Sequence, residues 1–204
     1  GVSVPLLKHS GGYLDRAIVR WHDWFGMPQG GRDLAQNNQL NYAISVDGAD
    51  QFSLTKRERG IGDVVVFAGK ALSANMTLRS ELKLPTGKSE RLMGSGGTDV
   101  NLSLDYQRRL AEHWNWGGSL SVVYLTDNDI GLMNQDILAA ISSYLVYRVK
   151  PRLALKIQWD LNTRAYKKVD LEPMNKFGGV LSFGGTLKLS DRDRLDLIFI
   201  ENLP

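Results

Sequence analysis

The chain contains no cysteine among its 204 residues, which excludes disulfide bonds and thiolate metal sites. It also lacks any apolar run near the roughly 18 residues that a transmembrane helix requires. The formal net charge is only +3 and no basic cluster stands out, so we expect no nucleic-acid partner. A membrane protein built from strands is not excluded, because barrel strands alternate apolar and polar residues and average to mild hydropathy.

Alternation of apolar and polar residues dominates the chain after residue 39. In the segment LKIQWDLN, the residues Leu155, Ile157, Trp159 and Leu161 share one face of an extended chain, and the residues between them are polar. A period of two predicts strands. It is clear at 40–47, 76–84 and 99–109, and weaker, with Gly or Ser replacing many polar residues, at 62–72, 113–125, 136–149, 177–189 and 193–202. Nine strands are predicted from residue 40 on, and a tenth at about 2–8.

Short and long connections alternate along this series of strands. Short turns are predicted near 72–75, 109–112, 149–152 and 189–192. Longer polar or Gly-rich loops separate them, at 48–61, 85–98, 126–135 and 166–176. One short turn and one long loop per hairpin is typical of outer-membrane barrels, whose short turns face the periplasm.

The segment 11–38 interrupts the alternation. Its apolar residues follow helical spacing up to Gly26, which predicts an amphipathic helix at about 13–25 followed by a loop. Counting strands back from the short turns places this segment on the periplasmic side. There it would lie on the end of the barrel, rest at the membrane interface or fold into the lumen as a plug. The residues assigned to this helix or plug are Leu14, Ile18, Trp21, His22 and Phe25.

Alternation alone does not distinguish a membrane barrel from a soluble barrel or sandwich, in which the apolar face points inward. Three features favour the membrane barrel. The apolar strips hold about five residues per face, enough to cross the hydrocarbon layer at a tilt. The polar faces carry both signs of charge at mid-strand. Aromatic residues share the apolar parity at strand ends, as an interfacial girdle would: Tyr106, Trp114, Trp116 and Tyr147.

The polar parity predicts the residues that line the lumen of such a barrel. They are Arg79, Glu81, Lys83, Asp99, Asn101, Asp105, Lys156, Gln158, Asp160, Asn162 and Arg164. One interpretation is a selectivity lining for a narrow channel. The other is a salt-bridged filling of the interior, because lumen charges must either pair or stay hydrated. The sequence leaves both open.

Catalytic and cofactor signals are weak. The three histidines have no metal-ligand spacing, and no metal or cofactor is expected. The doublets His9–Ser10 and His22–Asp23 are candidates for a lipid-modifying enzyme of the outer membrane, but adjacent residues rarely face one another. The string PTGKSERLMGSGG lacks the spacing of a phosphate-binding loop and is predicted to be a mobile external loop.

Three strings together carry a family resemblance: GGYLDRAIVRWHDWFGMPQGGRD at 11–33, GIGDVVVFAGKAL at 60–72 and LKLPTGKSERLMGSGGTDVNLSL at 82–104. Over nearly the whole chain the sequence resembles a porin-like family of Gram-negative outer-membrane proteins of unknown function, domain of unknown function 3187. The helix segment with PQGGRD is the more specific match. The resemblance implies a twelve-stranded barrel, with further strands before Gly1 and after Pro204. The chain departs from that pattern because it stops at FIENLP without a terminal aromatic residue.

The sequence therefore predicts an all-β fold: one antiparallel transmembrane barrel domain over 1–204, with about ten strands visible, twelve if complete, and a helix and loop insertion at 11–38. Because the chain begins with Gly1, either a signal peptide has been removed or the chain is a fragment. The expected location is the bacterial outer membrane, in contact with phospholipid or lipopolysaccharide. The expected function is a narrow passive channel or transporter of small or amphiphilic solutes. The alternatives are a lipid-modifying enzyme and a non-conducting scaffold that docks a periplasmic or membrane partner.

Overall fold

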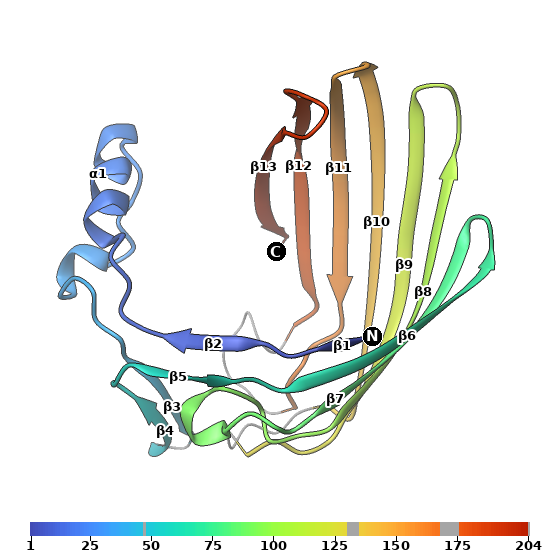
Figure 1. Ribbon diagram of the computed structural model, residues 1–204. Coiled ribbons are helices and arrows are strands. Elements are labelled where there is room, and N and C mark those ends of the chain that lie inside the picture. The colour runs from blue at the N-terminus through green and yellow to red at the C-terminus, as the bar shows by residue number, and fades with distance from the viewer. Residues whose placement is uncertain (47, 130–134, 168–175, 204) are drawn as a thin grey trace.

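One long curved antiparallel sheet dominates the computed structural model (Figure 1), which describes residues 1–46, 48–129, 135–167 and 176–203. The other described elements are smaller. The nine strands of the main sheet neighbour one another in the order β1 (Val2–Ser3), β6 (Val64–Ser73), β7 (Met76–Leu84), β8 (Asp99–Arg109), β9 (Trp114–Leu125), β10 (Ile137–Lys150), β11 (Leu153–Asn162), β12 (Gly178–Lys188) and β13 (Arg194–Leu203).

The main sheet follows the alternation of the sequence closely. Strands β7 and β8 coincide with the predicted segments, and β6, β9, β10, β12 and β13 begin and end within two residues of the predictions. From β6 to β13 each strand pairs with the next, as expected for a meander of hairpins. The predicted short turns join the strands at one end of the sheet, drawn from the top to the right-hand side of Figure 1. We call this the short-turn end and the opposite end the long-loop end.

At 40–61 the predicted strand is confirmed, but its place in the main sheet and the predicted loop 48–61 are wrong. The segment 40–47 forms β3 (Tyr42–Val46), which pairs with β4 (Ala49–Leu54) in a hairpin outside the main sheet. The predicted loop 48–61 contains β4 and also β5 (Glu58–Ile61), which pairs with β2 (Leu6–His9). Strands of only four to six residues offer too little periodicity for the sequence pattern to reveal which strand each one pairs with.

The predicted helix is confirmed as α1 (Asp15–Phe25), which ends at Gly26 in a left-handed conformation with φ 62°. The 3-10 helix η1 (Arg32–Leu34) follows it. Strand β1 runs antiparallel to β6, so the chain leaves the sheet and rejoins it at the long-loop end. The prediction that this segment lies at the same end as the short turns is therefore wrong. The count of crossings was off by one because β3 does not cross the main sheet.

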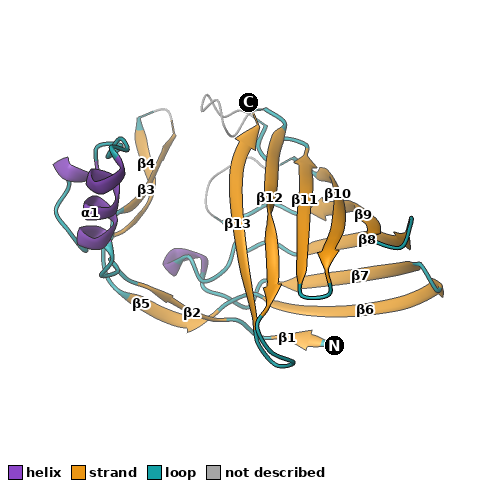
Figure 2. Ribbon diagram, turned by 90° about the horizontal axis from the view of Figure 1, so that it is seen from above, coloured by secondary structure: helices purple, strands orange, loops and turns teal. Residues whose placement is uncertain are grey.

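Helix α1 stands apart from the main sheet in both views (Figures 1 and 2). It contacts η1 and is held by its own flanking loop, where Gln29 donates to the carbonyl oxygen of Val19 and to Asp23. No residue of α1 is buried, and the Trp21 side chain is 55% exposed. The five predicted plug residues therefore do not cover the concave side of the sheet in this structure. No helix within the described residues is both long and apolar enough to cross a membrane.

The sheet has almost no apolar core. Among the described residues, Leu54 and Met93 are the only buried hydrophobic side chains. Within the described residues the sheet is also open, because β13 pairs only with β12 and β1 pairs only with β6. The structure thus confirms a mostly antiparallel β fold with a long sheet, whereas a closed barrel goes beyond what it shows.

Candidate functional site

The two faces of the main sheet differ sharply in chemistry. Paired residues of neighbouring antiparallel strands point to the same face. One row across five strands is entirely aliphatic: Leu78, Leu104, Leu120, Ile141 and Leu161. The adjacent row on the opposite face is polar for the same five strands: Thr77, Asp105, Ser119, Ser142 and Asp160. We call these two sides the apolar face and the polar face.

Exposure of the two faces is the reverse of that in a soluble sheet. On the apolar face, the side chain of Leu120 is 55% exposed and that of Ile141 is 52% exposed. On the polar face, Ser103 is only 7% exposed. Large aliphatic side chains normally occupy the interior, and an exposed apolar patch of this extent marks a surface that contacts something other than water.

Side chains of the polar face are linked in pairs across strands. Arg79 on β7 contacts Asp105 on β8, with Nε 2.6 Å from Oδ2. Lys83 contacts Asp99 at 2.6 Å. A chain of hydrogen bonds lies between these ion pairs and ends on a carboxylate, because Ser121 donates to Asn101 at 2.6 Å and Asn101 donates to Glu81 at 3.2 Å. Ten of the eleven predicted lining residues belong to this face, and the pairing of mixed charges that the sequence suggested is present on β7 and β8.

The other half of the polar face is less tightly paired. Gln158 donates to both carboxylate oxygens of Asp160 at 2.9 Å. The Lys156 ammonium lies 5.1 Å from the centre of the Tyr144 ring, a cation–π contact. Glu81, Lys156 and Asp160 form no ion pair within the described part of the chain. Among the ten predicted lining residues on this face, these three are the charges that a solute can meet without breaking an ion pair.

A cavity of about 380 Å³ opens on the polar face toward the short-turn end. Its lining includes the Arg79–Asp105 pair and Tyr144. Gly117 lies opposite Tyr144 in the ladder, and a Cβ at Gly117 would collide with the Tyr144 ring. Glycine at this position leaves room for the Tyr144 ring over the neighbouring strand, and the ring becomes part of the cavity wall.

The loop 85–98 is firmly attached, which corrects the prediction of a mobile loop. The Asp63 side chain is buried and accepts hydrogen bonds from the backbone N–H groups of Gly87 and Ser95, each at 3.0 Å. Lys83 lies 3.4 Å from the same carboxylate. A Cβ at Gly94 would collide with Asp63, so this position must be glycine for the loop to close on it. The loop, which includes the 3-10 helix η2 (Ser89–Arg91), therefore forms a fixed rim at the long-loop end.

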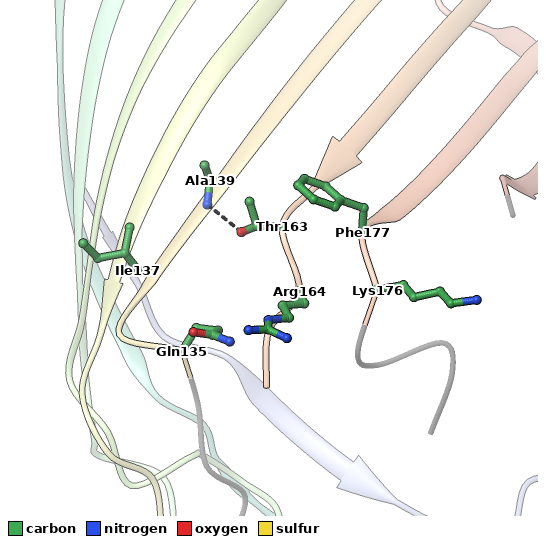
Figure 3. A pocket seen from close by; sticks show the side chains of 7 residues that line it. All are labelled: Gln135, Ile137, Ala139, Thr163, Arg164, Lys176 and Phe177. Atoms are coloured by element: carbon green, nitrogen blue, oxygen red, sulfur yellow. Dashed lines mark hydrogen bonds between the residues drawn. The ribbon is translucent and has the colours of Figure 1, made fainter. Parts of the chain in front are cut away.

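A larger cavity of about 700 Å³ lies at the long-loop end, beside the ends of β10, β11 and β12 (Figure 3). Thr163 accepts a hydrogen bond from the backbone N–H of Ala139 at 3.0 Å and holds the two strand ends together. Arg164 lies beside Gln135, whereas the Lys176 side chain points away from it (Figure 3). Arg164 thus lies beyond β11 and is the one predicted lining residue outside the polar face. Parts of the predicted loops 126–135 and 166–176 lie outside the described residues.

Aromatic side chains gather on the apolar face near the short-turn end, as the sequence predicted. The Tyr106 and Trp116 rings lie 5.5 Å apart, and the Trp114 and Tyr147 rings lie 4.5 Å apart. The Trp116 indole N–H donates to the Ser143 hydroxyl at 3.0 Å. Amphipathic rings with one satisfied polar atom suit a boundary between hydrocarbon and water.

The histidines lie on separate elements. The His9 ring hydrogen-bonds to the carbonyl oxygen of Leu92, and the His22 ring to that of Pro28, both at 2.9 Å. In the described residues no group of three or more His, Asp or Glu side chains could hold a metal. Neither predicted doublet is joined by a hydrogen bond between its own side chains in that part of the chain. The enzyme interpretation therefore gains no geometric support and stays a prediction.

Sequence patterns missed Asp63 and Tyr144. Asp63 follows two glycines in the string GIGD, at the junction of β5 and β6, and an acid at a strand start gives no periodic signal. Tyr144 lies in the string ISSYLVY, where serines and large apolar residues occur on both parities, so the pattern does not reveal which residues face the polar side. Register with β11, which pairs Tyr144 with Gln158, resolves that ambiguity.

Comparison with known proteins identifies a family but no activity. A family model described as a protein of unknown function, DUF3187, matches residues 1–204. No curated protein matches the chain.

Proposed function

The chain belongs to the DUF3187 family of unknown function, and we propose that it is a membrane-embedded β-sheet whose polar face lines a narrow passage for small or amphiphilic solutes. In this proposal the apolar face meets the hydrocarbon of a bacterial outer membrane. The polar face meets water. Transmembrane barrels have this polarity, and soluble sheets have the opposite one.

The exposure of the apolar face carries the proposal. A continuous aliphatic row crosses five strands, and no other layer of the described residues covers it. Strands β8 to β13 contain 10 to 14 residues. A transmembrane strand needs about 9–11 residues at a tilt of about 45°. The strands are therefore long enough to cross a bilayer, and the aromatic cluster marks one level of the interface.

The long-loop end becomes the external end under this proposal, because short turns of outer-membrane barrels face the periplasm. The fixed loop 85–98 and the 700 Å³ cavity then lie at the external mouth. The insertion that carries α1 also leaves the sheet at this end. The insertion is thus proposed to form part of an external rim instead of the periplasmic plug predicted from the sequence. The polar face then stays accessible from outside.

The least paired charges of the polar face should set ion preference. A unit charge about 10 Å from an ion in water contributes roughly 0.4 kcal/mol, which changes the occupancy of that ion about twofold. Removal of this positive charge raises the occupancy of cations about twofold and lowers that of anions about twofold, so we expect Lys156→Gln to raise the permeability ratio of cations to anions by about fourfold. The ratio is obtained from the reversal potential of the reconstituted protein in a planar bilayer under a salt gradient.

Lys70→Gln is the matched control for this measurement. Lys70 pairs with Leu78 and so lies on the apolar face, where its loss should leave the reversal potential unchanged. An unchanged reversal potential for Lys156→Gln, or an equal shift for Lys70→Gln, would contradict the assignment of the polar face as the conducting surface.

A scaffold is the second candidate, and the exposure of α1 favours it. The helix presents aromatic side chains to solvent, including Trp21 at 55% and Trp24 at 85% exposure. A docked partner would cover such a surface. A reconstituted protein that never conducts, with or without α1, would support the scaffold over the passage.

A further inference from the structure

The 700 Å³ cavity at the long-loop end has an apolar wall that belongs to the apolar face of the main sheet. Ile137 and Ala139 line the cavity, and they share the parity of Ile141, which lies in the aliphatic row. Phe177 directly precedes β12, is 76% exposed and lines the cavity from the side of that strand. The cavity therefore opens on the side of the sheet that meets hydrocarbon under the proposed function.

A guanidinium stands on a fixed backbone at the edge of this cavity (Figure 3). Arg164 lies two residues beyond the end of β11. The chain on either side of it is tied to the start of β10, because the Thr163 N–H donates to the carbonyl oxygen of Ala139 at 2.9 Å. The Gln135 N–H donates to the carbonyl oxygen of Ala165, also at 2.9 Å. Strand pairing thus sets the position of Arg164 relative to the apolar wall.

The positive charge of Arg164 has no counter-ion within the described part of the chain. The seven described residues that line the cavity include a second cation, Lys176, and no acid. Asp136, which follows the lining residue Gln135, is already paired with Lys167 at 2.6 Å. An apolar wall beside an unmatched positive charge is complementary to an anion that carries a hydrocarbon chain.

We propose that this cavity binds one anionic membrane lipid, with its phosphate on Arg164 and an acyl chain against Ile137 and Phe177. The planar guanidinium presents N–H donors in a fork that matches a phosphate, and such charge-assisted hydrogen bonds are stronger than neutral ones. The inference rests on the proposed function, because bilayer placement is what brings acyl chains to the apolar face. Under that placement Arg164 lies just beyond the hydrocarbon, where lipid headgroups lie.

The position of the cavity favours a lipid over a soluble anion. Its apolar wall on β10 continues into the aliphatic row at Ile141, so the chains of surrounding lipids reach the cavity without crossing water. A soluble phosphate would meet Arg164 alone and would gain nothing from the exposed Phe177 ring. A bound lipid covers both the charge and the ring, which the described protein leaves uncovered.

Native mass spectrometry of the full chain in detergent tests the proposal, because it counts the lipids that stay bound during a titration. Phosphatidylglycerol is the probe, and phosphatidylcholine with the same acyl chains, whose choline cation offsets the phosphate charge, is the reference. We expect one tightly bound phosphatidylglycerol and about tenfold weaker binding of phosphatidylcholine. Arg164→Gln should weaken phosphatidylglycerol binding about tenfold, the effect of one charged hydrogen bond, and should abolish the preference.

Arg152→Gln is the matched control for the charge. Arg152 is also an exposed arginine beside β11, but it lies at the short-turn end, so its loss should leave the affinity for phosphatidylglycerol unchanged. Phe177→Ala tests the apolar half of the site with Arg164 intact. The Phe177 ring is largely exposed, so its removal should not disturb folding, and we expect the affinity to fall roughly fivefold.

Three results would overturn the proposal. Equal weakening by Arg164→Gln and Arg152→Gln would indicate attraction by net charge alone. Unchanged affinity in Arg164→Gln or in Phe177→Ala would remove one half of the site. Displacement of phosphatidylglycerol by an equal concentration of inorganic phosphate or of palmitate would identify a site for a free anion or a fatty acid.

Failure of this proposal and failure of the proposed function are distinguishable. Lipid binding that requires Arg164, in a protein whose apolar face is not quenched by lipid-borne nitroxides, would keep the site and overturn the membrane placement. An apolar face that contacts lipid, in a protein that retains no phosphatidylglycerol, would keep the membrane placement and overturn the site.

Discussion

Leu120→Arg should destabilise the membrane-inserted protein by about 2–4 kcal/mol, the cost of arginine near the bilayer midplane on a barrel's lipid face. Leu120 lies mid-strand on β9, between Leu104 and Ile141 of the neighbouring strands. If the apolar face met water instead, arginine at this exposed position would change stability by less than about 0.5 kcal/mol. Urea unfolding of the protein in lipid vesicles measures the difference.

Ser119→Arg is the matched control, one residue away on the opposite face. Ser119 lies between Asp105 and Ser142 in the ladder, so a guanidinium there has an acidic neighbour and access to water. We expect its effect on the free energy of unfolding to be small. A larger loss for Ser119→Arg than for Leu120→Arg would mean that the two faces have been assigned the wrong way round.

Asp63→Ala should release the loop 85–98 from the sheet. The substitution leaves the backbone N–H groups of Gly87 and Ser95 without their acceptor. Each unsatisfied buried donor costs about 1–3 kcal/mol, so the expected loss of unfolding free energy is roughly 2–6 kcal/mol. Lys83 keeps its contact with Asp99, so no buried cation is left alone. Urea unfolding and limited proteolysis within the loop both report the change.

Glu90→Ala provides the comparison for Asp63→Ala. Glu90 belongs to the same loop, and its substitution also removes one carboxylate, but the Glu90 side chain is exposed. We expect a change within about 0.5 kcal/mol and no new cleavage site. Equal effects of the two substitutions would show that the loop is not held by the Asp63 carboxylate.

The period of two predicted the main sheet well because each strand is long and its two faces differ in chemistry. In β7 and β8 polar residues of one face alternate with mostly apolar residues of the other, apart from Ser80 and Arg108, so the pairing register had little freedom. The same argument predicted the ten lining residues on the polar face. It worked because paired residues on neighbouring strands share a face.

The sequence failed where topology is decided by contacts between distant segments. Whether 42–46 joins the main sheet or a separate hairpin depends on which edge is free, and alternation is the same in both cases. That single error moved the helix to the wrong end of the sheet. Arg164 was misplaced for a local reason, because β11 ends at Asn162 and parity loses its meaning beyond a strand end.

The sequence did not predict that loop 85–98 is held against the sheet, for a third reason. Its glycines resemble those of a flexible linker, yet Gly87 lies against the backbone of Met93 and Gly94 lies against the side-chain carboxylate of Asp63, so neither position has room for a Cβ. Glycine serves both purposes, close approach and freedom, and only the structure separates them.

A cysteine scan along β9 tests most directly which face meets lipid. Since the chain has no cysteine, each substitution at residues 119, 120, 121 and 122 introduces a single thiol. We predict that in reconstituted vesicles a charged, water-soluble maleimide labels positions 119 and 121, and that a fluorophore at 120 or 122 is quenched by lipid-borne nitroxides. Rapid maleimide labelling at 120 and 122, with 119 and 121 protected, would contradict the placement of the apolar face in the bilayer.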